Sequence, residues 1–314
     1  MIAPPQPKII TVGLVQETWQ RDPAAHAQAL RQGVLQAAAQ GAQLVCLQEL
    51  TLHRYFGDVK DKTLFALAEP LENGPTSTLC KQLAKEAGVF VVGSLYEKAN
   101  MQPRSHASNS SNSTHASLFN TAIITSPQGD FFGFTRKQHI PRGTGYNEDF
   151  YFEPGDSDYP VHDLGFIKLA IPTCYDQWFP ELARIYALKG AELIVYPTAI
   201  GSEPDHPGFD SQPLWQHTIT AHAIANGVFV AAVNRTGDDE DAAVDKRQKV
   251  TFYGSSFVCE PTGKIIAQAP RNTPAVVVAK LDFGVFAFWR ALFPLLSQRQ
   301  PQTYQRLLKN ERGQ

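Results

Sequence analysis

The chain has little cysteine, and its few thiols show no pairing pattern. Four cysteines occur in 314 residues, at positions 46, 80, 174 and 259, and no two of them have C-x-x-C spacing. This spacing argues against a disulfide scaffold and against a zinc site. We therefore expect no metal and a reducing compartment, which predicts a cytoplasmic protein.

The sequence also lacks long apolar runs and an excess of charge of either sign. No stretch reaches the ~18 apolar residues that a membrane helix needs, and no charged segment followed by an apolar one opens the chain. A formal net charge of −2 gives no field that would attract nucleic acid or an anionic membrane. We expect neither as a partner, which leaves small molecules. Apolar residues make up 43% of the chain, enough for a substantial core.

The second half of the chain repeats features of the first half in the same order. The matching segments are 40–46 with 189–195, 87–91 with 226–230, and the hairpin 126–130 with 260–264. Helix, strand, helix, strand and hairpin thus occur twice, which predicts two similar mixed sheets, each with helices on one face. The bare faces must bury each other, so we expect an α/β protein with a four-layer α-β-β-α sandwich.

This repeat predicts one domain over residues 1–314, with a core at about 8–282 and a C-terminal arm at about 283–314. The arm carries Phe286, Phe288, Trp289, Leu292 and Phe293. That is more apolar surface than a free tail shows to water, so we expect a homo-oligomer, a dimer or larger. A Ser/Asn-rich insertion at 99–117 is too polar to pack and is expected to form a surface loop.

Local patterns predict the individual elements. Asp22-Pro23 and Gly74-Pro75 open two helices that end at Gly41 and Gly88. The predicted strands are 8–16, 43–49, 89–96, 119–125, 131–137 and a run ending at 169–171, and a further helix is predicted at 178–189.

Cys174 lies on the connection between a predicted strand and a predicted helix. A thiol near a helix N-terminus meets unpaired N–H groups and the positive end of the helix dipole, which favour the thiolate. The alternative is an inert buried cysteine, since free cysteines are commonly small core residues.

Two further strand ends carry charge. Glu49 ends the predicted strand 43–49, and Lys137 ends the predicted strand 131–137. Each could form a structural salt bridge, because a charge at the end of a buried strand needs a partner. Together with Cys174 they supply a base, a cation and a nucleophile, the set that acyl transfer from an amide-like carbon requires.

Three segments carry a family resemblance: 47–50 around Glu49, 136–141 around Lys137 and 174–181 from Cys174. With them the chain resembles the nitrilase, or carbon–nitrogen hydrolase, superfamily over about 8–308. The resemblance implies Cys174 as nucleophile, Glu49 as general base and Lys137 as oxyanion partner, beside the backbone N–H of Tyr175. It implies no cofactor, and it also points to a homo-oligomer.

Within the superfamily, segments 143–156, 176–180 and 196–204 resemble the enzymes that hydrolyse N-carbamoylputrescine to putrescine, carbon dioxide and ammonia in polyamine synthesis. Alternatives are N-carbamoyl-β-alanine, an ω-amide or a nitrile as substrate, or a non-catalytic scaffold that keeps the fold. Pro172-Thr173 departs from the two apolar residues expected before the cysteine.

The remaining candidates have supporting roles. Glu148 matches an extra glutamate of the superfamily and either holds Lys137 and orients the substrate or forms a plain salt bridge. Asp176 is expected to cap a helix. The candidates for substrate binding are His139, Tyr146, Trp178, Ala199 and Glu203, with Asp205 and Asp210 as further carboxylates for a substrate ammonium, although each of these three carboxylates could be a solvated loop charge.

Overall fold

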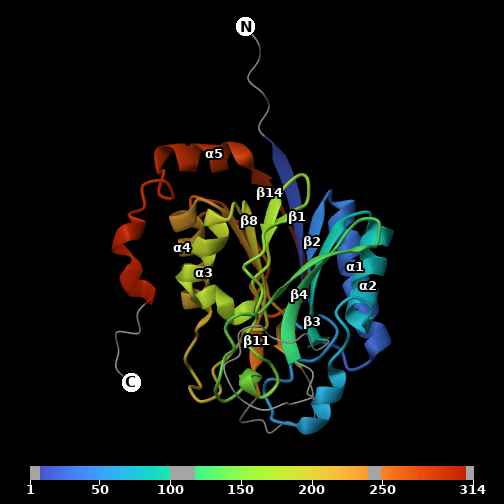
Figure 1. The fold of residues 1–314 in the computed structure, drawn as a ribbon. Helices are drawn as coiled ribbons and strands as arrows, with labels where there is room; N and C mark the ends of the chain where they lie inside the picture. Colours follow the sequence, from blue (N-terminus) through green and yellow to red (C-terminus); the bar gives the residue numbers. More distant parts are fainter. Residues whose placement is uncertain (1–7, 100–116, 240–248, 309–314) are drawn as a thin grey trace.

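The computed structural model describes residues 8–99, 117–239 and 249–308. Most of the predicted polar loop at 99–117 lies outside the described residues. Within the described part, two six-stranded sheets pack face to face between two pairs of helices (Figure 1).

The first sheet is built from the first half of the chain and one late strand. Parallel strands form its middle and antiparallel strands its edges. Its order is β14 (Ala275–Asp282), β1 (Ile9–Gln16), β2 (Leu44–Cys46), β3 (Phe90–Ala99), β4 (Ser117–Thr125) and β5 (Phe131–Arg136), and helices α1 (Pro23–Ala39) and α2 (Pro75–Ala87) cover its outer face.

The second sheet has the same plan. Its order is β6 (His162–Asp163), β7 (Lys168–Ala170), β8 (Leu193–Pro197), β9 (Phe229–Val233), β12 (Phe257–Cys259) and β13 (Ile265–Gln268), covered by α3 (Pro180–Leu188) and α4 (Gln212–Asn226). Strands β1 to β5 correspond in order to β7, β8, β9, β12 and β13. Strands β10 (Thr236–Asp238) and β11 (Thr251–Tyr253) form a separate, antiparallel two-stranded sheet.

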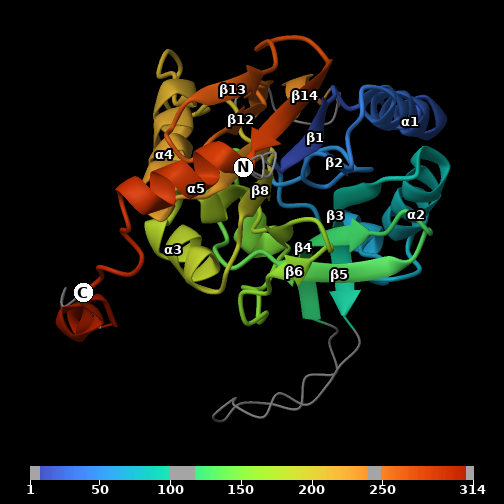
Figure 2. The same cartoon turned by 90° about the horizontal axis from the view of Figure 1, so that it is seen from above.

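One apolar layer joins the two sheets. Val12 and Cys46 of the first sheet lie in the same buried cluster as Val195 and Ala231 of the second. Two further clusters fill the spaces between each sheet and its helices. The predicted four-layer α-β-β-α sandwich is confirmed, and the view from above shows the layers in turn (Figure 2).

The predicted helix ends agree with the structure. The Asp22 side chain accepts hydrogen bonds from the backbone N–H groups of Ala24 and Ala25, so it caps α1. Gly88 ends α2 in the left-handed region, at φ 67°, where a glycine has no Cβ to strain.

Three strands end earlier than the sequence predicts, and β5 is one residue short, at Arg136. β2 ends at Cys46, three residues before Glu49, and β7 ends at Ala170. The backbone beyond β2 turns out of the ladder, and Leu50 adopts a left-handed φ of 50°. Glu49 therefore lies on a bent connection and not at the strand end, which brings its side chain round to the end of the sheet.

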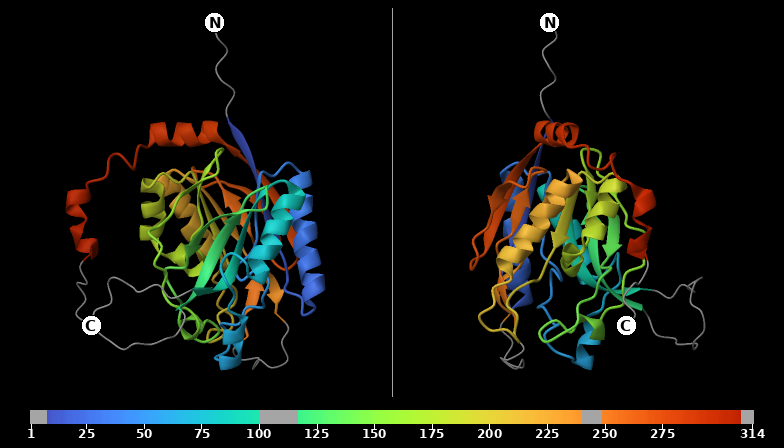
Figure 3. Two further views of the ribbon diagram at one scale, coloured as in Figure 1. Left: turned by 45° about the vertical axis from the view of Figure 1, so that its right-hand side comes forward. Right: turned by 90° about the vertical axis from the view of Figure 1, so that its left-hand side faces the viewer.

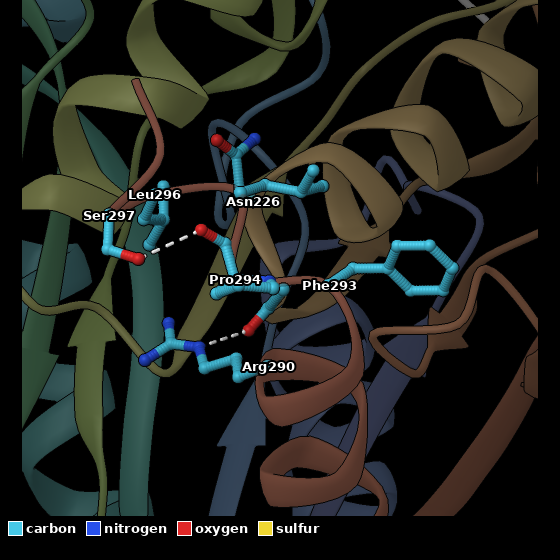
Figure 4. A pocket seen from close by; sticks show the side chains of 8 residues that line it. Asn226, Arg290, Phe293, Pro294, Leu296 and Ser297 are labelled. Carbon is cyan, nitrogen blue, oxygen red and sulfur yellow. Dashed lines mark hydrogen bonds between the residues drawn. The ribbon is translucent and has the colours of Figure 1, made fainter. Parts of the chain in front are cut away.

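The C-terminal arm runs across the end of the sandwich and then away from it. Its helix α5 (Phe283–Leu292) is tied to the end of α4, because Arg290 Nε donates to Gly227 O at 2.7 Å and Trp289 Nε1 donates to Ile224 O at 3.1 Å. A cavity of about 180 Å³ lies at this junction (Figure 4). Beyond it the chain passes through short 3₁₀ turns at Pro301–Thr303 and Gln305–Leu308, clear of the main body (Figure 3).

Candidate active site

Two carboxylates surround one buried ammonium group at the end of the first sheet. Lys137 directly follows β5, and its Nζ lies 2.8 Å from Glu49 Oε1 and 2.6 Å from Glu148 Oε2. All three side chains are fully buried. Burial alone would lower the pKa of Lys137, but the charges of Glu148 and Glu49 outweigh it and hold the pKa well above its usual value. Lys137 is therefore a fixed cation.

Glu49 uses only one of its two carboxylate oxygens in this arrangement. Oε1 accepts from Lys137 and from Asn120 Nδ2, the latter at 2.7 Å. Oε2 is buried and has no hydrogen-bond partner among the described residues. A buried carboxylate oxygen without a donor is a strong acceptor, so Oε2 is available to take a proton.

Cys174 comes from the other sheet, on the connection after β7. It begins a short 3₁₀ turn (Cys174–Trp178), its φ is a strained 44°, and its thiol donates to Ala199 O at a sulfur–oxygen distance of 3.9 Å. Burial raises the pKa of the thiol well above its usual value and the charge of Glu49 raises it further, while Lys137 opposes both. The structure thus brings Glu49, Lys137 and Cys174 together.

The prediction that a helix N-terminus favours the thiolate at Cys174 is wrong. Helix α3 begins only at Pro180, and Cys174 instead begins the short 3₁₀ turn that precedes it. Burial and the carboxylate of Glu49 instead favour the neutral thiol, and a base must remove its proton before it can attack.

Glu148 is held on both sides. Its Oε2 accepts from Lys137, and its Oε1 accepts from the hydroxyl of Tyr55 at 2.9 Å. Burial raises the pKa of Glu148 to about 7, against the lowering effect of Lys137. The sequence left two roles open for Glu148: holding Lys137 while orienting the substrate, or forming a plain salt bridge. The contact with Lys137 fits both roles. Glu148 also lines a cavity.

This cavity has a volume of about 450 Å³, within the range of small-molecule sites. Cys174 lines it, together with five residues that were predicted to support catalysis or bind substrate and three that were not predicted. The lining residues are Tyr146, Glu148, Tyr175, Trp178 and Glu203, with Pro141, Arg142 and Ile200.

Other predicted candidates lie elsewhere. The His139 ring stacks on Phe179 with centroids 3.6 Å apart, and His139 is not among the cavity-lining residues. Ala199 is buried behind the thiol of Cys174. Asp205 is exposed, and Asp210 pairs with Arg271 at 2.8 Å on the surface.

Asp176 connects the loop that carries Cys174 to the residues that follow Lys137. It forms a capping box with Thr173, and its carboxylate also accepts from the backbone N–H groups of Gln138 and His139. One side chain thereby fixes the connection that carries Cys174 against the residues that follow Lys137. The predicted capping role is correct, with this second function added.

The sequence analysis missed a buried network behind Glu49. Arg235 Nη2 donates to the backbone carbonyl of Glu49 at 2.8 Å, and its Nη1 pairs with Asp239 at 2.5 Å. Asp239 in turn accepts from the backbone N–H of Tyr55, the residue that contacts Glu148. Arg235 follows the buried strand β9. Like Glu49, it is a charged residue after an apolar strand, and this sequence signal could have identified it.

Comparison with known proteins agrees with this geometry. The sequence matches the carbon–nitrogen hydrolase family over residues 11–291, so the chain belongs to that family. It is an enzyme of a class that hydrolyses non-peptide carbon–nitrogen bonds.

Individual relatives are similar along most of their length. The chain is 38% identical to an N-carbamoylputrescine amidase of Arabidopsis thaliana over 88% of this chain and 87% of that protein. It is 34% identical to a citrullinase of Francisella tularensis over 96% and 98%. A crystal structure of a carbon–nitrogen hydrolase from Helicobacter pylori G27 superposes with a TM-score of 0.84 at 31% identity, covering 96% and 99%.

Within residues 8–99, 117–239 and 249–308, no group of three or more His, Cys, Asp or Glu side chains is arranged to hold a metal ion. In the same ranges, no helix is long and apolar enough to cross a membrane.

The four thiols should differ sharply in reactivity. Cys46, Cys80 and Cys259 are fully buried in apolar clusters, and burial raises the pKa of Cys80 and of Cys259 to about 12. Iodoacetamide should alkylate Cys174 first, by on the order of tenfold or more, because among the four thiols only this one lines the cavity. Peptide mass mapping over time measures the order, and earlier labelling of Cys80 or Cys259 would contradict the assignment.

Proposed function

We propose that the chain hydrolyses N-carbamoylputrescine to putrescine, carbon dioxide and ammonia, with Cys174 as nucleophile. The observation that carries this proposal is a single cavity with the thiol, the fixed ammonium of Lys137 nearby, and the carboxylate of Glu203 among its lining residues. The similarity to N-carbamoylputrescine amidases supports the choice of substrate.

The first chemical step follows from the protonation states. Glu49 Oε2 takes the proton of Cys174, and the sulfur bonds to the carbamoyl carbon. The oxygen that gains negative charge is stabilised by Lys137 and by the backbone N–H of Tyr175. Lys137 suits this task because its carboxylate partners hold its pKa well above the usual value.

The second step returns the enzyme to its first state. The C–N bond breaks, and Glu49 gives its proton to the departing nitrogen, which leaves as an amine. Glu49 then takes a proton from a water molecule that attacks the thiocarbamate carbon, and it returns this proton to the sulfur as the C–S bond breaks. The resulting carbamic acid decomposes to carbon dioxide and ammonia, so one water is consumed overall, and no step needs a cofactor.

One carboxylate of the cavity lining favours a substrate with a cationic tail. The ammonium of the substrate loses hydration on binding and needs a charged or polar acceptor. Of the two carboxylates that line the cavity, Glu148 already pairs with Lys137, which leaves Glu203 for the substrate. A substrate ending only in a carboxylate, such as N-carbamoyl-β-alanine, would leave Glu203 without a cationic partner. A scaffold without activity would not need a buried carboxylate whose charge acts on a thiol at a cavity.

We also propose a homo-oligomer in the cytoplasm. The arm shows large apolar side chains to solvent, including Phe288 at 60% and Leu308 at 90% exposure. Such a surface is typical of a contact with a second copy. All four cysteines are free thiols, in keeping with a reducing compartment.

The triad is tested by single substitutions. Cys174→Ala and Cys174→Ser should abolish ammonia release, because a serine hydroxyl is a much weaker nucleophile at neutral pH. Lys137→Ala should lose on the order of 3 kcal/mol or more of transition-state stabilisation. Glu49→Gln should be equally inactive. Circular dichroism checks that each protein folds, and a folded variant with wild-type turnover would overturn the mechanism.

Specificity is tested at Glu203. Glu203→Gln should raise KM for N-carbamoylputrescine about tenfold or more, the size expected for one charge-assisted hydrogen bond. Alkylation of Cys174 should not change. Asp210→Asn is the matched control, since Asp210 pairs with Arg271 on the surface, and an equal effect of both substitutions would refute the role of Glu203.

Assembly is tested by light scattering. The mass should be a multiple of the 34.6 kDa chain. The double variant Phe288→Asp with Leu292→Asp should dissociate, because it places charge on the exposed face of the arm. Gln36→Asp, on the exposed side of α1, should not change the mass. A wild-type monomer would exclude the proposal.

A further inference from the structure

A buried carboxamide contacts the proposed base directly. Asn120 lies in β4 and is fully buried. Its Nδ2 donates to Glu49 Oε1 at 2.7 Å, and the same oxygen accepts from Lys137 Nζ at 2.8 Å. Both donors therefore meet one oxygen of the carboxylate, and Oε2 is left without a partner within the described part of the chain.

The orientation of this carboxamide is fixed from its other end. The hydroxyl of Ser94, in β3, donates to Asn120 Oδ1 at 3.3 Å. The oxygen of the same hydroxyl accepts from the backbone N–H of Leu50 at 3.2 Å. A carboxamide has its acceptor on one side and its donors on the other, so the contact of Oδ1 with Ser94 turns Nδ2 toward Glu49. Because Leu50 directly follows Glu49, these contacts form a closed ring around the base.

The strand pattern places Ser94 and Asn120 on the inner face of the first sheet. Ser94 pairs with Ala122 in the register of β3 with β4, and Asn120 is two residues from Ala122. Side chains two residues apart lie on the same face of a strand. On this face, Val92, Ala122 and Ile124 belong to the apolar layer between the sheets. The rows become polar at Ser94 and Asn120, where the proposed base lies.

We propose that Asn120 is a positioning residue, which makes Oε2 of Glu49 the proton acceptor by holding Oε1. Rotation of the carboxylate would break two hydrogen bonds, one to Asn120 and one to Lys137. A hydrogen bond to the charged form of a carboxylate also favours that form. Asn120 acts through Glu49, because it is not among the residues that line the cavity. This inference rests on the proposed function, since it takes Glu49 as the base.

Charged and titratable groups surround Glu49 on its other sides. Arg235 Nη2 donates to the backbone carbonyl of Glu49 at 2.8 Å. The side chains whose charges act together with that of Glu49 are Tyr55, Lys137, Glu148 and Cys174. Asn120 contacts the carboxylate without carrying a charge. Asn120→Asp therefore adds a carboxylate of nearly the same shape against Oε1.

The experiment measures kcat, KM and their pH dependence with N-carbamoylputrescine for the wild type, Asn120→Ala and Asn120→Asp. Asn120→Ala should lower kcat about tenfold or more, the size of one hydrogen bond to a charged group, and change KM by less than about twofold. Activity on the acid side is lost when the base is protonated. A second carboxylate makes that protonation easier, so Asn120→Asp should move the acid limb of kcat/KM about one pH unit or more upward.

Thr121→Val is the matched control. Thr121 is the next residue of β4 and is also fully buried, and its hydroxyl donates to Glu97 Oε2 at 2.7 Å. Its substitution removes a buried hydrogen bond of the same strand without touching Glu49, so the melting temperature should fall while kcat and the pH profile stay as in the wild type. If the folded Asn120 variants behaved like Thr121→Val, Asn120 would be structural only and the inference would fail.

Alkylation of Cys174 by iodoacetamide separates this inference from the choice of substrate. Asn120→Ala should slow the labelling of Cys174 in the wild-type background and change nothing in a Glu49→Gln background, because Asn120 acts through the carboxylate. Equal slowing in both backgrounds would overturn the inference. A wild type that shows the expected labelling pattern and releases no ammonia from N-carbamoylputrescine would overturn only the proposed substrate.

Discussion

The ion cluster of Lys137 with Glu49 and Glu148 is the interaction on which the site depends. Three buried charges away from water are tolerated only when each is paired and hydrogen-bonded, and removal of one partner leaves the others strongly destabilised. Here the ammonium satisfies two carboxylates at 2.8 and 2.6 Å. One carboxylate oxygen, Oε2 of Glu49, is left without a donor in the described part of the chain, and this one atom gives the cluster its chemistry.

The fold supplies this cluster from both of its halves. Glu49, Lys137 and Glu148 come from the first half, and Cys174 comes from the second. The proposed base, Glu49, and the proposed nucleophile, Cys174, therefore lie in different halves. Activity requires the two sheets to pack together.

Buried polar contacts fix the register between the halves. Asp176 ties the loop of Cys174 to the residues after Lys137, and Arg235 ties β9 to the backbone of Glu49. Asn120 and Tyr55 then orient the two carboxylates directly.

The sequence predicted the layers of the fold because its repeated pattern leaves few ways to bury two apolar sheet faces. It also selected Glu49, Lys137 and Cys174, since charges and a thiol after apolar strands are conspicuous. It failed where three-dimensional context decides. Burial and the charge of Glu49, a residue distant in the sequence, raise the pKa of the Cys174 thiol. Arg142 and Arg235 look like ordinary basic residues until the loops are folded together.

The central claim is that Cys174 forms a covalent bond to the carbamoyl carbon. It is tested most directly by acid quenching of the wild-type enzyme during turnover of N-carbamoylputrescine, followed by mass mapping of its peptides. The account predicts a carbamoyl-type adduct on the peptide containing Cys174 that disappears when the substrate is exhausted. An adduct on another residue, or sustained turnover with Cys174 unmodified at every time point, would contradict it.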